Sequence, residues 1–227
     1  MRNAESAIDT PVSVLYGSAH GRYKMHKLKI ISRNVFIPSP GSGIGVWGAT
    51  YYTERTGGRL LSTHSFISRS DTIDVAYLRF SDDNGRTWGP ATERETRFAD
   101  PGGTGRRHLR GGYVDQRTGR FLSLWVEGIL PTDQPLEGMR HWTIHASVSE
   151  DGGRTAKFNG PIIHKGPGYD KRHPFPDVTV GKNCIMMGDL GMRPITRSDG
   201  AILVPVQSSP IGLDGEYYCP TGAFTYL

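Results

Sequence analysis

The segment SDDNGRTW, residues 81–88, has the form Ser-x-Asp-x-Gly-x-Thr-Trp. A second, less complete copy, SEDGGRT, occupies residues 149–155, and Phe158 follows it in place of the tryptophan. Gly85 and Gly153 can adopt a positive φ without steric cost, and the aspartate of each copy can accept hydrogen bonds from its own turn. We therefore predict a tight turn between two strands in each copy, with the aromatic residue anchoring the turn on the sheet.

Alternating apolar and polar residues precede both turns, at residues 73–80 and 142–148. Such alternation is typical of a half-buried strand. The 30 glycines and 15 prolines of the 227-residue chain favour short strands and frequent turns, and no stretch sustains the apolar period of a helix. The sequence therefore predicts an all-β protein built from repeated units.

Both turns resemble the Asp-box of sialidases (neuraminidases) and related β-propellers with BNR repeats. The resemblance implies a sialidase-like β-propeller, in a family with six blades, of which this chain holds about three. In that family the Asp-box is a structural turn away from the reaction centre. No chemical role is therefore assigned to the residues of either turn.

The chain is predicted to be one partial propeller domain over residues 1–227, built from four-stranded blades. Residues 1–33 are expected to form a lead-in, which is irregular over 1–26 and ends in a strand at 27–32 that can close a ring. Blade 1 is expected at 34–98, blade 2 at 99–166, and an incomplete blade 3 at 167–227. Strands A to D, from the inside out, are expected at 34–38, 45–53, 73–81 and 91–97 in blade 1, at 108–115, 120–127, 140–149 and 161–165 in blade 2, and at 190–196, 201–207 and 216–226 in blade 3.

Three incomplete blades cannot close a ring, and an open stack leaves exposed sheet edges. The chain therefore resembles the N-terminal half of a sialidase. We expect it to need a partner chain or a missing C-terminal half to close the propeller and complete an active site.

Strand parity limits where chemistry can lie. The Asp-boxes occupy C–D loops, so candidate residues should come from the opposite end, where the D–A and B–C loops meet. In sialidases the B–C loop of blade 1 carries an arginine and then an aspartate that acts as general acid/base. Arg55 and Asp71 match these places within the loop expected at residues 54–71, and Asp74 is a weaker alternative to Asp71.

Arginines at the starts of A strands would face the central channel, where a guanidinium can hold a carboxylate by two hydrogen bonds. Arg110 and Arg193 are substrate-binding candidates on this geometric ground alone, and solvated or structurally paired arginines remain the alternative. Sialidases have an Arg-Ile-Pro motif in blade 1, but residues 36–38 read Phe-Ile-Pro, without the arginine. Asp133 and Glu137 share the expected end as B–C loop residues and are given no catalytic role.

The formal net charge of +5 suits an acidic ligand, but the basic residues are spread along the chain. We expect a glycan as substrate or ligand, and neither nucleic acid nor a membrane as partner. No spacing of ligand residues predicts a metal site, and no cofactor is expected. Cys184 and Cys219 could pair. No signal peptide or membrane-spanning stretch is recognised, so a cytoplasmic location is the default expectation.

The resemblance and these residues together predict a sialidase-like glycoside hydrolase of the exo-α-sialidase type, incomplete or divergent. It would cleave a terminal sialic acid or a related anionic sugar, with Asp71 as acid/base. Three alternatives remain open. One is a propeller that binds carbohydrate or protein without catalysis, which the absent arginine before Ile37 favours. Another is a glycosidase or lyase that acts on another saccharide, and the third is an inert fragment that folds only in a larger assembly.

Overall fold

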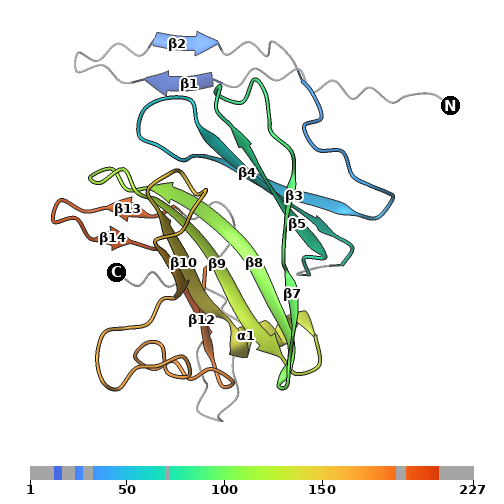
Figure 1. The fold of residues 1–227 in the computed structure, drawn as a ribbon, viewed down its shortest axis with the longest axis vertical. Coiled ribbons are helices and arrows are strands. Elements are labelled where there is room, and N and C mark those ends of the chain that lie inside the picture. The colour runs from blue at the N-terminus through green and yellow to red at the C-terminus, as the bar shows by residue number, and fades with distance from the viewer. Residues whose placement is uncertain (1–12, 17–23, 28–32, 70–71, 188–192, 210–227) are drawn as a thin grey trace. The chain divides into compact units, whose positions relative to one another are not determined.

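The computed structural model describes residues 13–16, 24–27, 33–69, 72–187 and 193–209. Within these residues the protein is all-β, with a single 3₁₀ turn and one helical turn between its strands (Figure 1). The chain divides into two compact units, residues 1–38 and 39–227.

In the first unit, β1 (Ser13–Tyr16) pairs antiparallel with β2 (Lys24–Lys27). The prediction of an irregular lead-in over residues 1–26 is therefore wrong for these segments, and most of the strand predicted at 27–32 lies outside the described residues. No strand forms at residues 34–38, where an A strand was predicted. Val35 and Phe36 are 78% and 45% exposed, so these apolar side chains do not form a buried strand face.

The first sheet of the second unit contains β3 (Gly45–Tyr52), β4 (Leu60–Ile67), β5 (Val75–Ser81) and β6 (Thr92–Arg94), hydrogen-bonded in chain order. The predicted strands at 45–53 and 73–81 correspond to β3 and β5. Because β4 lies between them, β3 is the first strand of the sheet, and the residues predicted as one long loop contain a central strand.

The polar composition of β4 explains why it was missed. Ser62, His64 and Ser65 are all buried, as are the neighbouring Leu60 and Leu61. A strand that pairs on both sides and is covered on both faces shows no simple alternation of apolar and polar residues. Small polar side chains in β4 therefore resemble a loop in the sequence.

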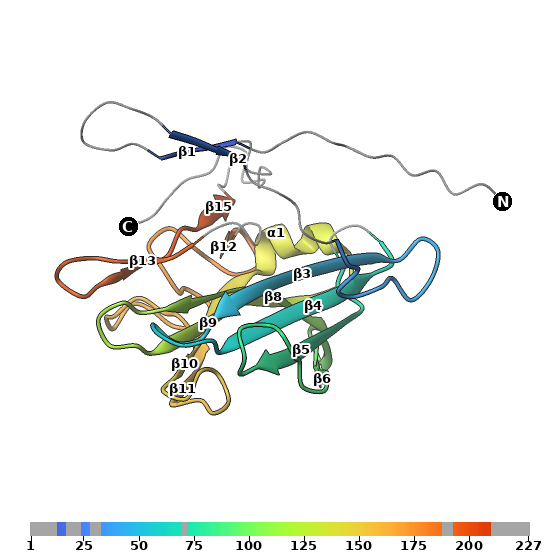
Figure 2. The same ribbon diagram turned by 90° about the horizontal axis from the view of Figure 1, so that it is seen from above.

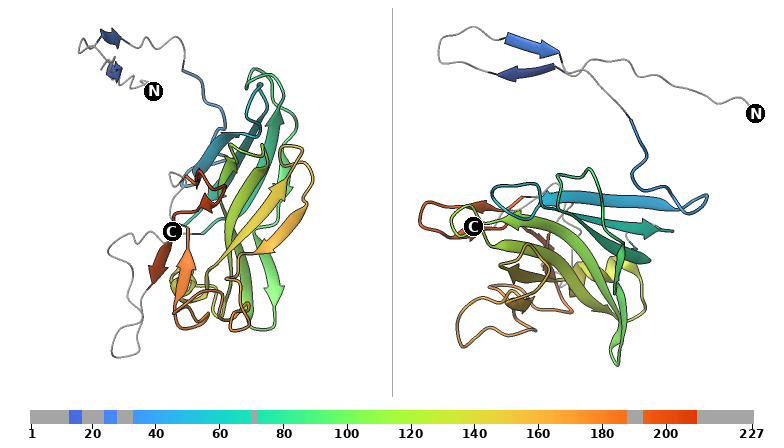
Figure 3. Two further views of the ribbon diagram at one scale, coloured as in Figure 1. Left: turned by 90° about the vertical axis from the view of Figure 1, so that its left-hand side faces the viewer. Right: turned by 45° about the horizontal axis from the view of Figure 1, so that its top comes forward.

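The second sheet contains β7 (Arg97–Asp100), β8 (Gly103–Val114), β9 (Phe121–Leu130), β10 (Thr143–Ser149) and β11 (Phe158–Pro161), in the order β11-β10-β9-β8-β7. The 3₁₀ turn η1 (Pro135–Glu137) and helix α1 (Gly138–His141) connect β9 to β10. The relative order of the four strands predicted for blade 2 is confirmed, and the last begins at Phe158 instead of residue 161. The strand predicted as innermost, β8, is not the edge of the sheet, because β7 pairs with it. Figure 2 shows β8 and β9 beside β3 and β4, and Figure 3 shows that β8 and β9 curve along their length.

Four short strands follow. β12 (Cys184–Met186) pairs with β15 (Gln207–Ser209), and β13 (Ile195–Thr196) pairs with β14 (Ile202–Leu203). The A and B strands predicted for blade 3 overlap β13, β14 and the start of β15, whereas β12 was missed. The strand predicted at 216–226 and Cys219 lie outside the described residues, and Cys184 is a free, buried thiol.

Two apolar cores lie on the faces of the second sheet. Tyr51, Leu61, Val114 and Phe121 join the first sheet to the second. On the other side, residues of β9 and β10 pack against the β12 and β15 region, with Leu124, Val126, Trp142, Ile185 and Val206 among the buried side chains. The first sheet, the second sheet and the β12–β15 pair therefore follow one another face to face.

The predicted turns are confirmed at atomic detail. The Ser81 hydroxyl accepts the Gly85 N–H at 2.9 Å and donates to Asp83 at 2.8 Å, and Asp83 accepts both the N–H and the hydroxyl of Thr87, at 2.8 and 2.6 Å. Trp88 donates its Nε1–H to the Gly85 carbonyl at 3.1 Å. Gly85 has a φ of +80°.

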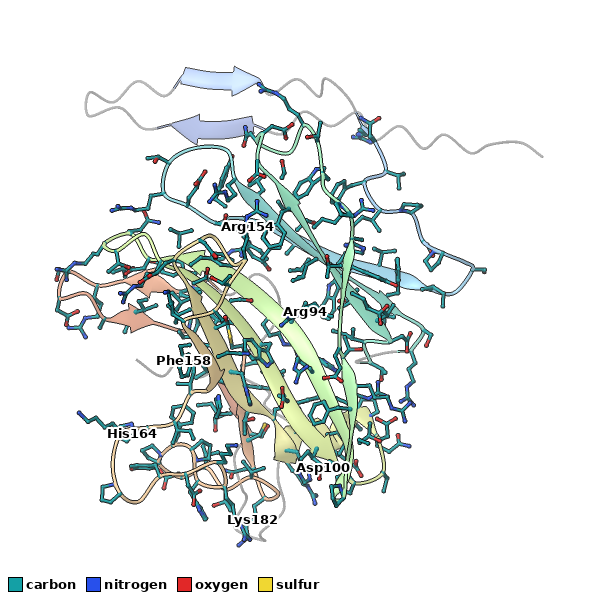
Figure 4. All side chains as sticks on the ribbon, in the orientation of Figure 1. Arg94, Asp100, Arg154, Phe158, His164 and Lys182 are labelled. Carbon is teal, nitrogen blue, oxygen red and sulfur yellow. The ribbon has the colours of Figure 1, made fainter. Side chains whose placement is uncertain are left out.

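The second turn repeats this network with Ser149, Gly153, Asp151 and Thr155, at distances between 2.6 and 2.9 Å. Its aromatic anchor was predicted wrongly. Phe158 belongs to β11, because its backbone pairs opposite Val148. Its side chain, labelled in Figure 4, is 48% exposed.

Candidate functional site

Antiparallel pairing brings the connecting turns to two opposite ends of the sheets. The β3–β4 and β8–β9 turns lie with the two Asp-box turns, at what is here named the Asp-box end. The β4–β5 and β9–β10 connections lie at the other end, named the arginine end. Contacts between the sheets agree with this assignment, since Arg55 reaches the carbonyl of Gln116 at one end and Arg69 reaches Asp133 at the other.

The prediction that Arg55 and Asp71 share a single loop is wrong. Arg55 precedes β4, whereas Arg69 and Thr72, the described residues that flank Asp71, follow it. The eight residues of β4 span about 25 Å. Arg55 therefore belongs to the Asp-box end, while the residues around Asp71 belong to the arginine end; Asp71 itself lies outside the described residues.

Arg55 and Arg193 come together instead in a cleft of about 530 Å³ at the Asp-box end. The cleft lies between the last residues of β3, the β3–β4 turn and the last residues of β8. Arg55 donates from Nη1 to the carbonyls of Gln116 and Arg117, at 3.3 and 3.2 Å. These bonds hold its guanidinium against the β8–β9 turn.

Arg193 lies over an aromatic ring. Its guanidinium carbon is 4.9 Å from the centre of the Tyr51 ring, which suits a cation–π contact. Burial raises the pKa of Tyr51 above its ordinary value, and the nearby charge of Arg193 partly opposes that rise. Tyr51 is therefore a neutral phenol at physiological pH and supports the guanidinium through its ring.

Arg110 does not line this cleft. It lies at a β-bulge of β8, where the register shifts between Leu109 and Gly111, and it is only 7% exposed. Its carbonyl accepts the Tyr51 hydroxyl at 3.5 Å. A bulge can redirect a side chain within a sheet, and here the redirected arginine is buried inside the protein.

At the arginine end, three arginines approach the carboxylate of Asp133. Arg106, at the start of β8, donates from Nε and Nη2, each at 2.7 Å. The Nη2 atoms of Arg97 and Arg69 lie 3.6 and 3.8 Å from Asp133 Oδ2. The Arg106 side chain is 8% exposed, whereas those of Arg69 and Arg97 are 49% and 62% exposed. We name these four residues the arginine cluster.

The electrostatics of the cluster follow from this geometry. The hydrogen bonds from Arg106 lower the pKa of Asp133, and the charges of Arg97 and Arg69 add to the effect, so Asp133 is ionised at neutral pH. The neighbouring His108 packs against Trp142 with a centroid distance of 4.8 Å, and burial lowers its pKa to about 3. Three cations therefore meet one carboxylate beside a neutral histidine, which leaves an excess of positive charge.

Sequence reasoning missed Arg69, Arg97 and Arg106 as candidate site residues. The strand-parity rule did select their end of the sheets, and it selected Asp133 as a residue of the β9–β10 connection. The available signal was the position of each arginine: Arg69 follows β4, Arg97 begins β7 and Arg106 lies near the start of β8. Only the correct strand assignment places these positions together.

The described residues contain no group of three histidines, cysteines or acidic side chains arranged to hold a metal ion. In the same part of the chain, no helix has the length and apolar character needed to cross a membrane. No protein-family model matches the chain, and no curated protein matches its sequence.

Proposed function

We propose that this chain is a sialidase-like glycoside hydrolase of the exo type, which cleaves a terminal sialic acid or a related anionic sugar. The observation that carries the proposal is the arginine cluster. Guanidinium groups from three separate elements converge at the end opposite the Asp-box turns, and Arg69 stands two residues before Asp71 in the sequence. Clustered arginines suit recognition of a carboxylate because each offers a planar fork of donors.

The proposal includes a β-propeller architecture. It is supported by the two Asp-box turns with their matching hydrogen bonds, and by sheets that follow one another face to face. In a propeller the inner strands of successive sheets surround a central channel.

In this proposal Asp71 is the general acid that protonates the glycosidic oxygen of the leaving group. Arg69 and Arg97, the more exposed members of the cluster, attract the carboxylate of the sugar. Arg106 is held by Asp133 and adds its positive charge to theirs. No role is assigned to a metal or a cofactor.

Hydrolysis of a fluorogenic sialoside tests the proposal, with a fluorogenic glucuronide and a neutral galactoside as comparison substrates. We expect turnover of an acidic substrate that is lost in Asp71→Asn and weakened mainly through KM in Arg69→Gln. Arg197→Gln is the matched control, because Arg197 pairs with Asp199 and is remote in sequence from the cluster. Equal turnover by the wild type and Asp71→Asn, or no turnover of either acidic substrate, would contradict the proposal.

A second candidate function is binding of an acidic glycan without catalysis. The observation that favours it is the bidentate pair between Arg106 and Asp133, in which a carboxylate of the protein already occupies the most buried guanidinium of the cluster. Retention of acidic glycans on an array without release of free sugar would support this second function. Release of free sugar would support the first.

A further inference from the structure

The cleft at the Asp-box end holds two guanidinium groups that no described carboxylate neutralises. Within the residues that the structure describes, Arg55 donates to backbone carbonyls and Arg193 packs on Tyr51, and neither forms a salt bridge. Sequence reasoning gave this end only a structural role. We propose that this cleft is a second binding site, which takes the carboxylate of an acidic sugar unit independently of the arginine end.

The charge balance of the cleft supports binding of an anion. Glu54 is the acidic side chain among the lining residues. It accepts the backbone N–H of Arg59 at 3.1 Å, and its other oxygen lies 3.8 Å from the Arg59 guanidinium. The Arg59 guanidinium also donates to Asp82 at 3.2 Å, so Glu54 is only partly neutralised. Two arginines and one glutamate therefore line the cleft, and a net positive charge faces a ligand.

Both guanidinium groups are held in place before any ligand arrives. Arg55 is fixed by two carbonyl oxygens of the β8–β9 turn, and Arg193 is held by its contact with the Tyr51 ring. A planar guanidinium that is already ordered loses little side-chain entropy when it forms a bidentate pair with a carboxylate. The order of these two side chains therefore favours a carboxylate as the ligand group.

The remaining lining suits a sugar ring. Tyr52 is 53% exposed, and its hydroxyl donates to Asn84 at 2.8 Å, which fixes the orientation of an accessible aromatic face. The hydroxyl of Tyr113, on the β8 side, bonds to Thr196 at 2.6 Å. Aromatic faces combined with a few oriented polar groups, in a cleft of this volume, are typical of small-molecule sites. The choice of a sugar as the carrier of the carboxylate rests on the proposed function.

Isothermal titration calorimetry of the 227-residue chain tests the site with N-acetylneuraminic acid, glucuronic acid and methyl glucoside. We expect the acidic sugars to bind and methyl glucoside to bind much more weakly. Arg193→Gln should weaken acidic-sugar binding at least about tenfold, the effect of losing one charged hydrogen-bonding partner. Arg193→Lys should weaken it less, and the control Arg197→Gln should bind like the wild type.

The thermal unfolding midpoint of each variant shows whether it folds, and Arg55→Gln provides a second test should Arg193→Gln unfold. Unchanged affinity in an Asp71→Asn variant would support a site that is separate from hydrolysis. Absence of binding by the wild type, equal affinity for methyl glucoside, or wild-type affinity in folded Arg193→Gln and Arg55→Gln would overturn the inference. Hydrolysis at the arginine end is measured separately, so wild-type affinity in folded Arg193→Gln and Arg55→Gln can be told apart from a failure of the proposed function.

Discussion

The carboxylates of Asp83 and Asp151 stabilise their turns through the same kind of contact. Each accepts the hydroxyl and the N–H of the threonine four residues later, and each accepts the hydroxyl of the serine two residues earlier. Hydrogen bonds from Thr87 lower the pKa of Asp83 from 3.8 to about 2. Bonds from Ser149 and Thr155 lower the pKa of Asp151 in the same way. The ionised carboxylate is therefore the form that the folded turn requires.

These shifts predict a loss of stability in acid. Because the pKa of Asp83 is lower in the folded protein than the ordinary value of 3.8, its contribution is complete above about pH 4 and declines as the pH falls toward about 2. An Asp83→Asn variant should be less stable at neutral pH and should show a shallower decline between pH 4 and 2. Thermal unfolding midpoints over this range provide the measurement.

Asp82→Asn is the neighbouring control for this prediction. The Asp82 carboxylate bonds to Arg59 and Arg154 and makes no bond within its own turn. The variant keeps Asp83 and should keep the decline of the wild type between pH 4 and 2. An equally steep decline in Asp83→Asn would show that the turn carboxylate is not its source.

At the scale of the strands, Arg106 and Asp133 join the start of β8 to the β9–β10 connection. Two hydrogen bonds of 2.7 Å and a side chain that is 8% exposed make this the most buried ion pair of the arginine cluster. Removing one partner of such a pair leaves the other charge without compensation in a poorly solvated place. Arg97 and Arg69 approach the same carboxylate from more exposed positions and should matter less.

Arg106→Met should therefore lower the free energy of unfolding by roughly 3 kcal/mol. Arg97→Met, the matched control with a 62% exposed side chain, should change it by less than about 1 kcal/mol. Asp133→Asn should resemble Arg106→Met, and the double variant should lose less than the two single losses combined, because both remove the same interaction. Urea denaturation measures all four proteins, and equal losses in Arg106→Met and Arg97→Met would contradict the assignment.

Sequence patterns predicted the strands whose two faces differ in polarity or whose turns carry glycine. β5 and β10 were located by the Asp-box that follows them, and the β8–β9 pair by the turn at Gly119, whose φ is +78°. β4 could not be found in this way, because it is covered on both faces and contains buried Ser62, His64 and Ser65. An expected strand at 34–38 took its place, so β3 was predicted as the second strand of the first sheet instead of the first, whereas β5 and β6 keep their predicted third and fourth places.

That one error also decided which site residues were predicted to meet. Because the prediction missed β4, it placed Arg55 and Asp71 in one loop. The structure instead places Arg55 and Arg193 in one cleft. The arginine cluster depends on contacts between residues 27 to 64 positions apart, such as Arg106 with Asp133 and Arg69 with Asp133. Local sequence spacing contains no signal for such contacts, since they arise from how two sheets pack.

Within residues 39–227, arginines of successive turns also tie each sheet to the next. Arg55 of the β3–β4 turn donates to the carbonyls of Gln116 and Arg117. Arg117, in the β8–β9 turn, then donates from Nη1 to the carbonyl of Ser198, in the β13–β14 turn, at 3.1 Å. Arg154, which is labelled in Figure 4, links the two Asp-box turns through Asp82 at 2.8 Å. Its guanidinium lies over the Phe80 ring. The same device thus recurs from one sheet to the next.

This recurrence predicts that loss of one arginine loosens one boundary between sheets and leaves the other intact. Arg117→Ala should speed amide hydrogen exchange in the β13–β14 hairpin and leave β3 and β4 unchanged, because its donor reaches only the later turn. Arg55→Ala should instead speed exchange in the β3–β4 and β8–β9 turns.

Each variant should lose about 1 kcal/mol of stability, the usual net value of a hydrogen bond from a charged donor at a partly exposed site. Arg120→Ala is the control from the same β8–β9 turn, since Arg120 pairs with exposed Glu150 at 3.2 Å, and it should alter exchange in neither hairpin. If Arg117→Ala speeds amide hydrogen exchange equally at both boundaries, the sheets loosen as one body. The arginine contacts would then not determine the stability of individual boundaries.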